Sequence, residues 1–271
     1  MTHSYRVVPA VSHELAREAY KIRHKVYCSE LNFEEINHQE IERDQYDDHS
    51  SQLVVFHKKA KSYVGCVRLV HGYHDGVHFE LPFEHHCRGR LDEAFIQKIK
   101  ESGARYAEVS RLAIDKGFRN KKPKEHNRNH HLSKAISSSV LLSLYLGLQA
   151  LAKQQQLRYV FAIVEPRLLK NFHKHGIPAV QVGQAIDHRG LRVPIVIDVL
   201  EFETCMPLAF RRLYKNIRKD VGKFLSPKLE IKDLETDSLL NGVLQFPIKP
   251  AAINNAINGD KPATVKHGAY A

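Results

Sequence analysis

The sequence lacks several features that would assign its class directly. Its four cysteines, Cys28, Cys66, Cys87 and Cys205, are scattered without a CxxC pair, which excludes a zinc-finger arrangement and favours a reducing compartment. The first ten residues have no apolar core of the kind found in secretion signals. The longest apolar run, 140–151, is shorter than the ~18 to 20 residues that a transmembrane helix needs. We therefore expect a cytoplasmic protein whose cysteines are inert, partly buried thiols.

Charge is unevenly distributed over the chain. A formal net charge of +11 and a pI near 9.4 predict attraction to nucleic acid, anionic lipid or an acidic protein surface. The basic residues gather in 115–131 and 206–225 without a nucleic-acid-binding motif, so we expect no nucleic-acid partner. Residues 30–48 are acidic instead. Apolar side chains interleaved with these acids predict that part of the loop folds back onto the body as a lid.

Hydrophobic periodicity and turn residues predict an alternation of strands and helices. Ser12 is a suitable N-cap for the first helix, which should end near Cys28. The predicted strands are 5–11, 52–57, 63–73, 107–114, 158–164, 179–186 and 192–199, and the predicted helices are 12–28, 91–101, 132–156, 167–175 and 206–225. We expect a main domain over 1–203, a basic helical extension over 204–246 and a disordered tail over 247–271.

The stretch 107–114, AEVSRLAI, is an apolar strand with only two charged residues, Glu108 and Arg111. Regular pleating would send Glu108 and Ser110 to one face of the sheet and Arg111 to the other. The two charges share a face only if a β-bulge resets the alternation, and such a bulge would leave a backbone N–H or C=O unpaired for a ligand. We predict the central strand of a mixed sheet here. A buried ion pair between Glu108 and Arg111 is the structural alternative.

Two further arginines fall at the edge of predicted apolar surfaces. Arg68 shares a strand face with Val64, Cys66 and Val70. Because a guanidinium stays charged when it is buried, Arg68 must find a carboxylate or bind a ligand. Arg23 lies beside the apolar stripe of the first helix, where a solvated side chain is the simpler interpretation.

An ordered set of short segments connects these residues. RHKVYCSELNF begins at Arg23, ERDQYDDHS at Glu42, GCVRL at Gly65, LPF at Leu81 and EVSRL at Glu108. The set resembles the acyl-homoserine-lactone (autoinducer) synthases and the long-chain N-acyl amino acid synthases, and most closely the acyltransferases that accompany PEP-CTERM/exosortase systems. The resemblance covers about residues 5–200 and implies an α/β fold of the GNAT type. Such a fold has a mixed, mostly antiparallel sheet with splayed central strands flanked by helices, here with a C-terminal helical extension.

The resemblance and the chemistry of acyl transfer together suggest roles for the charged residues. Glu108 would be the general base, directly or through a water, and bulge N–H groups near Ser110 would stabilise the oxyanion. Arg68 and Arg111 would either bind the carboxylate of the acceptor or hold Glu108 by an ion pair, and both options stay open. The expected catalytic residues are Glu108, Ser110 and Arg111, and the expected substrate-binding residues are Arg23, Phe33, Asp44, Asp47 and Arg68. Arg23 should pair with one of the two aspartates across the acceptor site.

The loop after the central strand bears on the acyl donor. Coenzyme A-dependent GNAT enzymes present a glycine-rich (Q/R)xxGxG turn to the pyrophosphate, and 115–131 has lysines and arginines in its place. This composition suits docking of an acidic acyl carrier protein, which carries a phosphopantetheine thioester. The residues expected to dock it are Arg119, Lys121, Lys122, Lys124 and Arg128. We expect no tightly bound cofactor and no metal, with acyl carrier protein or acyl-CoA serving as donor substrate.

These expectations describe an N-acyltransferase that moves a fatty-acyl chain from a thioester to the amine of an amino acid or a related small acceptor. One alternative is an acyl-homoserine-lactone synthase that uses S-adenosylmethionine. Phe33 stands where those enzymes usually have tryptophan, which counts against it. The other alternative is a protein bound peripherally to the inner membrane through 206–225, without catalysis, because this helix pairs basic residues with an apolar side.

Overall fold

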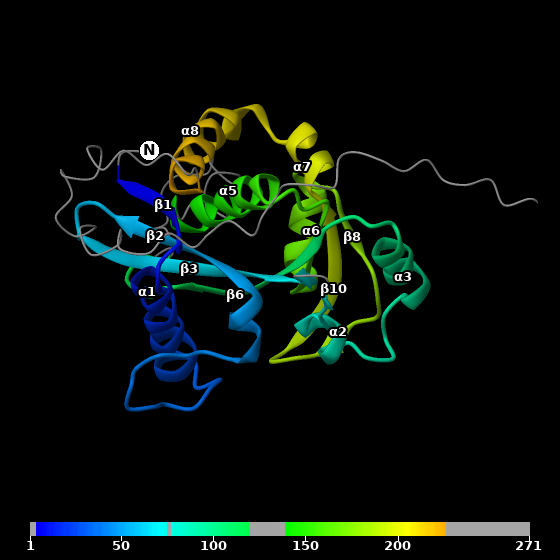
Figure 1. Ribbon diagram of the computed structural model, residues 1–271, viewed down its shortest axis with the longest axis horizontal. Helices are drawn as coiled ribbons and strands as arrows, with labels where there is room; N and C mark the ends of the chain where they lie inside the picture. Colours follow the sequence, from blue (N-terminus) through cyan, green and yellow to red (C-terminus); the bar gives the residue numbers. More distant parts are fainter. Residues whose placement is uncertain (1–3, 75–76, 120–138, 226–271) are drawn as a thin grey trace, which may run out of the picture.

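The computed structural model describes residues 4–74, 77–119 and 139–225, which form one mixed sheet covered by helices on both faces (Figure 1). The strand order is β1-β2-β3-β6-β7-β10-β8, with β9 also paired to β10, and each neighbouring pair is antiparallel except the parallel pair β6 and β7. The strands are β1 Tyr5–Pro9, β2 Ser50–His57, β3 Ser62–His71, β6 Tyr106–Ile114, β7 Tyr159–Val164, β8 Ala179–Gln181, β9 Ile186–Asp187 and β10 Leu191–Asp198. A separate short hairpin joins β4 Tyr73–His74 to β5 Val77–His78. This is the mixed, mostly antiparallel sheet that the sequence predicts.

The helices form two layers, with α5 and α8 above the sheet in Figure 1 and α1 below it. The α-helices are α1 His13–Arg23, α2 Pro82–His86, α3 Glu93–Glu101, α5 Ser139–Gln154, α6 Pro166–Lys174, α7 Val199–Cys205 and α8 Leu208–Leu225. The chain of α1 continues as a π-helix over His24–Glu30, and a 3-10 helix spans Gln45–His49. Ser12 caps α1, since its side chain accepts a hydrogen bond from Leu15 N, as predicted.

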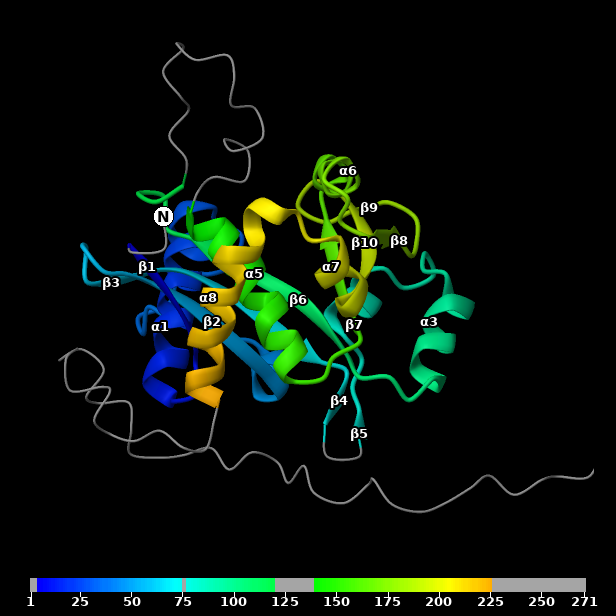
Figure 2. The same ribbon diagram turned by 90° about the horizontal axis from the view of Figure 1, so that it is seen from above.

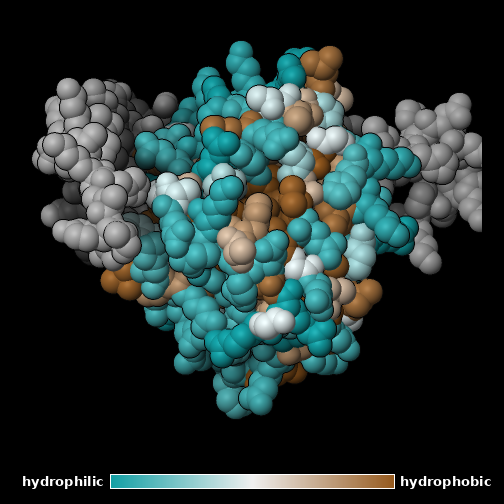
Figure 3. Space-filling model, turned by 90° about the vertical axis from the view of Figure 1, so that its right-hand side faces the viewer, coloured by the Kyte–Doolittle hydropathy of each residue, from teal (hydrophilic) through white to brown (hydrophobic). Residues whose placement is uncertain are grey.

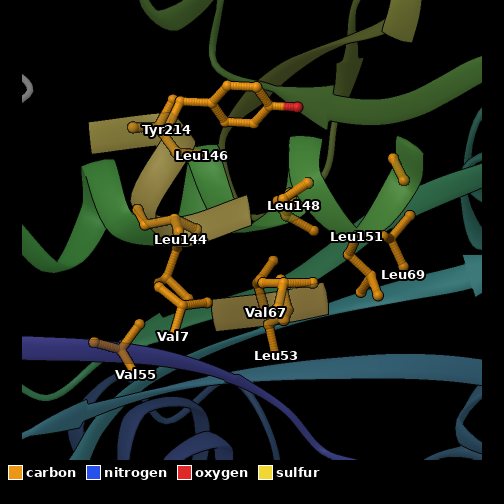
Figure 4. Close-up of a cluster of buried hydrophobic side chains, with 14 of the residues drawn as sticks. Val7, Leu53, Val55, Val67, Leu69, Leu144, Leu146, Leu148, Leu151 and Tyr214 are labelled. Carbon is orange, nitrogen blue, oxygen red and sulfur yellow. The ribbon is translucent and has the colours of Figure 1, made fainter. Parts of the chain in front are cut away.

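The upper layer contains the larger core. Side chains of α5 reach down onto the sheet, where Leu144 lies over Val7, and Leu148 and Leu151 lie over Val67 and Leu69 (Figure 4). Because this surface of α5 is completely enclosed, the near-continuous apolar run in its sequence has a structural cause. The apolar core between α1 and the lower face of the sheet is smaller. Buried charged side chains lie on this face as well.

The parallel pair β6 and β7 separates after a short contact. The two strands are paired only from Tyr106 opposite Tyr159 to Glu108 opposite Phe161. Beyond Glu108, β6 continues to Ile114 without this partner, so the two central strands splay apart. The predicted splay is therefore present, and it begins at Glu108.

A β-bulge lies on the other side of β6, against β3. Cys66 is opposite Ala113 and Arg68 is opposite Ser110, so that Arg111 and Leu112 together face Val67. Arg111 has a φ of 51°, a left-handed conformation that is uncommon outside glycine. The extra residue resets the alternation, as predicted, and brings Arg111 to the same side of the sheet as Ser110.

Helix α8 is packed on the body of the molecule rather than projecting from it. Tyr214, Ile217 and Val221 are buried in the same core cluster as α5 and β1, and from above α8 runs along α5 (Figure 2). The apolar side that a membrane anchor would need is thus occupied within the protein, so a lipid contact would have to use the basic side. Within the described ranges, no helix is long and apolar enough to cross a membrane.

Some predicted boundaries differ from the structure. The segment LPF, where no helix is predicted, starts α2, because Pro82 fits the first turn of a helix where no N–H is required. The predicted strand 179–186 is interrupted, giving β8 and β9. For 132–156, the structure describes a helix from Ser139, and the residues before it lie outside the described ranges.

The surface near α3 and β8 carries apolar side chains among hydrophilic ones (Figure 3). Val180 on β8 and Phe95 on α3 are among the exposed large apolar residues. Strand β8 has only three residues, and such a short edge limits pairing with another chain.

We predict that α8 contributes to the stability of the main domain. Ile217→Ala should lower the free energy of unfolding by about 2 to 4 kcal/mol, because it opens a cavity in the core between α8 and α5. Leu208→Ala, at a side chain that is 77% exposed on the same helix, should change it by less than about 0.5 kcal/mol. Urea denaturation of the full chain measures both, and equal effects would show that α8 is not docked as described.

Candidate functional site

A cleft of about 600 Å³ runs between the splayed strands β6 and β7. It reaches from the lower face of the sheet, where polar residues surround its mouth, to the upper face under α5, α6 and α7. The mouth is lined by Phe33 and by the polar residues His86, Glu108, Ser110, Arg111, His188 and Arg189. The apolar wall includes Leu148, Ala152, Val160, Ala162, Leu168, Phe172, Ile195, Ile197 and Phe202. One end can therefore hold a polar reacting group and the other an extended apolar chain.

Glu108 lies where the two strands part, and its side chain is only 3% exposed. Its Oε2 accepts a hydrogen bond of 2.7 Å from Phe83 N, in the first turn of α2. Burial raises the pKa of Glu108 to about 8, and the Phe83 N–H and the charges of Arg68 and Arg111 oppose this rise only in part. A carboxyl group with this pKa can exchange a proton near neutral pH, as general acid–base catalysis requires.

Arg23 is fully buried and is bound by two carboxylates from the acidic loop. Its guanidinium donates two hydrogen bonds to Asp47, of 2.6 and 3.0 Å, and one to Glu42. Asp47 also accepts from Gln52 Nε2 at 2.7 Å. Burial alone would raise the pKa of Asp47, but hydrogen bonds and charge from Arg23 lower it below its ordinary value. Arg23 thus pairs with one of the two predicted aspartates, and the solvated interpretation of Arg23 is wrong.

Arg68 and Arg111 extend this network to the bulge. Arg68 donates to Ser110 Oγ at 3.0 Å and pairs with Asp44 and with Asp47. Arg111 Nε donates to Glu42 Oε1 at 3.1 Å, and its Nη2 lies 3.0 Å from Asp44 Oδ2. The acidic loop and the central strands are therefore joined through shared carboxylates.

The alternative ion pair between Glu108 and Arg111 does not form. Although the bulge places both residues on one side of the sheet, Arg111 is taken by Glu42, Asp44 and Glu34. In the part of the chain that the structure describes, Glu108 receives a hydrogen bond from the Phe83 backbone and none from Arg68 or Arg111. The two arginines act on Glu108 through their charge alone.

Sequence reasoning missed Glu42, which is 7% exposed and bridges Arg23 to Arg111. The signal was available in the segment ERDQYDD, where Glu42 stands two residues before Asp44. His86, His188 and Arg189 were also missed. They come from α2 and from the β9–β10 turn, whose position at the cleft depends on the tertiary fold.

The acidic loop folds back through its charges rather than through all of its apolar residues. Three of the apolar side chains interleaved with the acids, those of Leu31, Phe33 and Ile36, are exposed. Phe33 still lines the cleft, under the guanidinium of Arg189 at 4.9 Å from the ring centroid. Tyr46, which packs against the lower core, is the part of the apolar pattern that behaves as predicted.

Four of the five predicted docking residues, Lys121, Lys122, Lys124 and Arg128, lie outside the described ranges. Arg119 is described, and its guanidinium is engaged by Glu30 and by the carbonyl of Ile114 at 2.6 Å. It is therefore less available to a partner than expected. Within the described ranges no group of three or more His, Cys, Asp or Glu side chains is placed to hold a metal ion.

A bulged central strand beside a splay, with a cleft passing through it, is the architecture of GNAT-type acyltransferases. The family described as acetyltransferase (GNAT) domain matches residues 22–126. An acyl-homoserine-lactone synthase of Aeromonas hydrophila is 24% identical over 181 residues, which cover 66% of this chain and 77% of that enzyme.

Two solved structures share the fold. FeeM, an N-acyl amino acid synthase from uncultured soil microbes, is 13% identical, with a TM-score of 0.50 over 76% of this chain and 96% of FeeM. BjaI, a CoA-dependent acyl-homoserine-lactone synthase, is 17% identical, with a TM-score of 0.51 over 87% of this chain and 99% of BjaI. The domain match, the sequence relatives and the shared fold together support an N-acyltransferase.

We predict that Asp47 is required for the fold of the site as well as for its charge balance. Asp47→Ala should destabilise the protein by about 3 to 5 kcal/mol, because it leaves Arg23 and Arg68 buried with too few carboxylates. Asp48→Ala, which removes a side chain that is 71% exposed and paired with Arg43, should cost under ~1 kcal/mol. Thermal unfolding of both variants tests this, and an Asp47 variant as stable as the Asp48 variant would refute the buried network.

Proposed function

We propose that this protein is an N-acyltransferase that moves a fatty-acyl chain from a thioester to the amine of an amino acid or a related small acceptor. The observation that carries the proposal is the cleft, because it connects a buried, titratable Glu108 with an apolar interior between the two central strands. A protein that only bound lipid would have no use for a buried carboxyl group at the strand junction.

The acyl chain of the donor would occupy the apolar wall beneath α5, α6 and α7. Its thioester carbonyl would lie beside β6, after Glu108, where the strand has lost its partner β7 and passes through the bulge. Unpaired backbone N–H groups in this segment would stabilise the developing oxyanion. Ser110 would keep Arg68 in position rather than react, since its Oγ accepts from Arg68 Nε.

The acceptor would enter from the lower face, against the acidic loop. Arg23, Arg68, Arg111 and Arg189 are matched there by Glu34, Glu42, Asp44 and Asp47. These carboxylates offset the charge of the four arginines on the side of the acidic loop. Glu108 would remove a proton from the attacking nitrogen and return it to the departing thiolate sulfur.

The donor and the acceptor are proposed from the sequence. The missing glycine-rich turn and the basic composition of 115–131 favour a carrier-protein thioester over coenzyme A, although BjaI, which shares the fold, is CoA-dependent. Phe33 in place of tryptophan favours an amino acid over S-adenosylmethionine. A place beside PEP-CTERM/exosortase systems is part of the same proposal, and mass spectrometry of lipids from overexpressing cells would identify the head group and the acyl length.

We predict that Glu108→Gln gives a folded but slow enzyme. The loss in kcat/KM should be about 10²- to 10⁴-fold at pH 7. In the wild type, kcat/KM should rise with pH through about 8 as Glu108 loses its proton, and this step should be missing in the variant. Glu80→Gln, at an exposed carboxylate before α2, is the matched control and should keep the wild-type profile. An unchanged profile in Glu108→Gln would remove Glu108 from the chemistry.

We also predict a salt-sensitive preference for acyl carrier protein. Reversing the charges of Lys121, Lys122 and Lys124 should lower kcat/KM for the carrier-protein thioester at low salt and leave the CoA thioester unaffected. Reversing Lys215, Lys219 and Lys223 on α8 changes the net charge equally and serves as the control. Equal sensitivity of both triple variants would mean that overall charge, rather than this loop, attracts the donor.

A further inference from the structure

Two histidines that the proposed mechanism does not use face each other at the mouth of the cleft. His86 is the last residue of α2, three residues after Phe83, whose N–H binds Glu108. His188 lies in the turn between β9 and β10. Their ring centroids are 4.3 Å apart, and both side chains line the same cleft as Glu108. Two elements that are distant in sequence therefore bring imidazoles to one place.

The turn that carries His188 is fixed to the acidic loop. Arg189, the next residue, donates to the Phe33 carbonyl at 3.0 Å and to Glu34 at 2.7 Å. Among the described residues, neither the His86 nor the His188 side chain forms a hydrogen bond with the protein. The ring nitrogens are therefore available to a ligand or to water. The contacts of Arg189 thus fix the turn that carries His188, while the ring nitrogens of both histidines have no hydrogen-bond partner among the described residues.

The charges around the pair are mainly positive. Arg111, Arg189 and Arg192 face the two rings from β6, the turn and β10, Glu34 faces His188 from the acidic loop, and His85 precedes His86 on α2. Partial burial, followed by these positive neighbours, lowers the pKa of both histidines. Near neutral pH both rings are therefore unprotonated, and each would carry a proton only transiently, as a relay to solvent does.

The balance of the proposed reaction requires such an acceptor. An ammonium and a thioester give an amide, a thiol and one free proton, so two N–H protons must leave the nitrogen. One passes to the sulfur when the C–N bond forms and the C–S bond breaks, and Glu108 can carry it within the cleft. The other must reach solvent. Glu108 is 3% exposed, whereas His86, which lines the same cleft, is exposed.

We propose that His86 and His188 form the proton exit of this site, and that the pair passes to solvent the proton that the acceptor ammonium releases. The inference rests on the proposed acyl transfer to an amine. Two groups then handle the two protons that leave the nitrogen. The imidazole pair conducts one proton to solvent, and Glu108 transfers the other to the thiolate sulfur.

The test uses the full-length protein with a palmitoyl thioester and whichever of the twenty amino acids gives most product with the wild type. His86→Ala should lose at least 10-fold in kcat at pH 7, and added imidazole should restore part of it. The loss should shrink above pH 9, where the free amine needs no base. His188→Ala should show a smaller loss of the same kind. His85→Ala, at the exposed neighbour outside the cleft lining, should match the wild type.

The outcomes separate the two proposals. A wild-type protein that acylates no amine refutes the proposed function. A wild type that does so, with His86→Ala and His188→Ala variants equally fast from pH 6 to 9, refutes only the proton exit. A loss that imidazole does not restore, at an unchanged melting temperature, also refutes it, because it assigns His86 a positioning role. If His86→Ala unfolds, His86→Asn replaces it, and rates are expressed per folded molecule.

Discussion

The β-bulge at Arg111 is the constraint on which the rest of the site depends. A left-handed φ at a residue other than glycine costs about 1 to 3 kcal/mol, so it persists only where the surroundings hold it. Here Glu42 and Asp44 bind the Arg111 side chain, and they are themselves held through Arg23 and Arg68. The bulge gathers Ser110 and Arg111 on the face that Glu108 occupies. Beside it the strands separate, and the cleft passes through the opening.

The charge network and Glu108 have opposite electrostatic characters. The arginines and carboxylates beside the bulge neutralise one another, so each stays ionised despite burial. Glu108 is left outside this pairing and meets mainly apolar surface and one backbone N–H, which is why its pKa rises to about 8. At the point where β6 and β7 separate, the protein therefore contains a carboxyl group whose ionisation is unfavourable. The proposed acid–base role would account for that arrangement.

The sequence was sufficient to predict the elements whose cause is local. A bulge was the one way for the two charges of the apolar strand to share a face, Ser12 marked the start of α1, and the arginine on an apolar face of β3 had to find a carboxylate or a ligand. Which carboxylate pairs with which arginine was not predictable, because the pairing depends on how residues 30–48 cross the lower face of the sheet. Asn32 and Glu40 turn the chain there with positive φ values that no glycine signals. Glu42 looked like one acid among many, and His188 reaches the cleft only because β10 pairs with β7 and brings the β9–β10 turn to the mouth.

The most direct test of this account is a titration of Glu108 itself. Carbon-13 NMR of protein labelled at the glutamate carboxyl carbon, compared with Glu108→Gln to assign the signal, measures its pKa in the folded chain. We expect a midpoint near 8, well above the ordinary value of 4.5. A midpoint near 4.5 would mean that Glu108 is ionised and solvated at neutral pH, and would contradict the buried acid–base group on which the proposed acyl transfer rests.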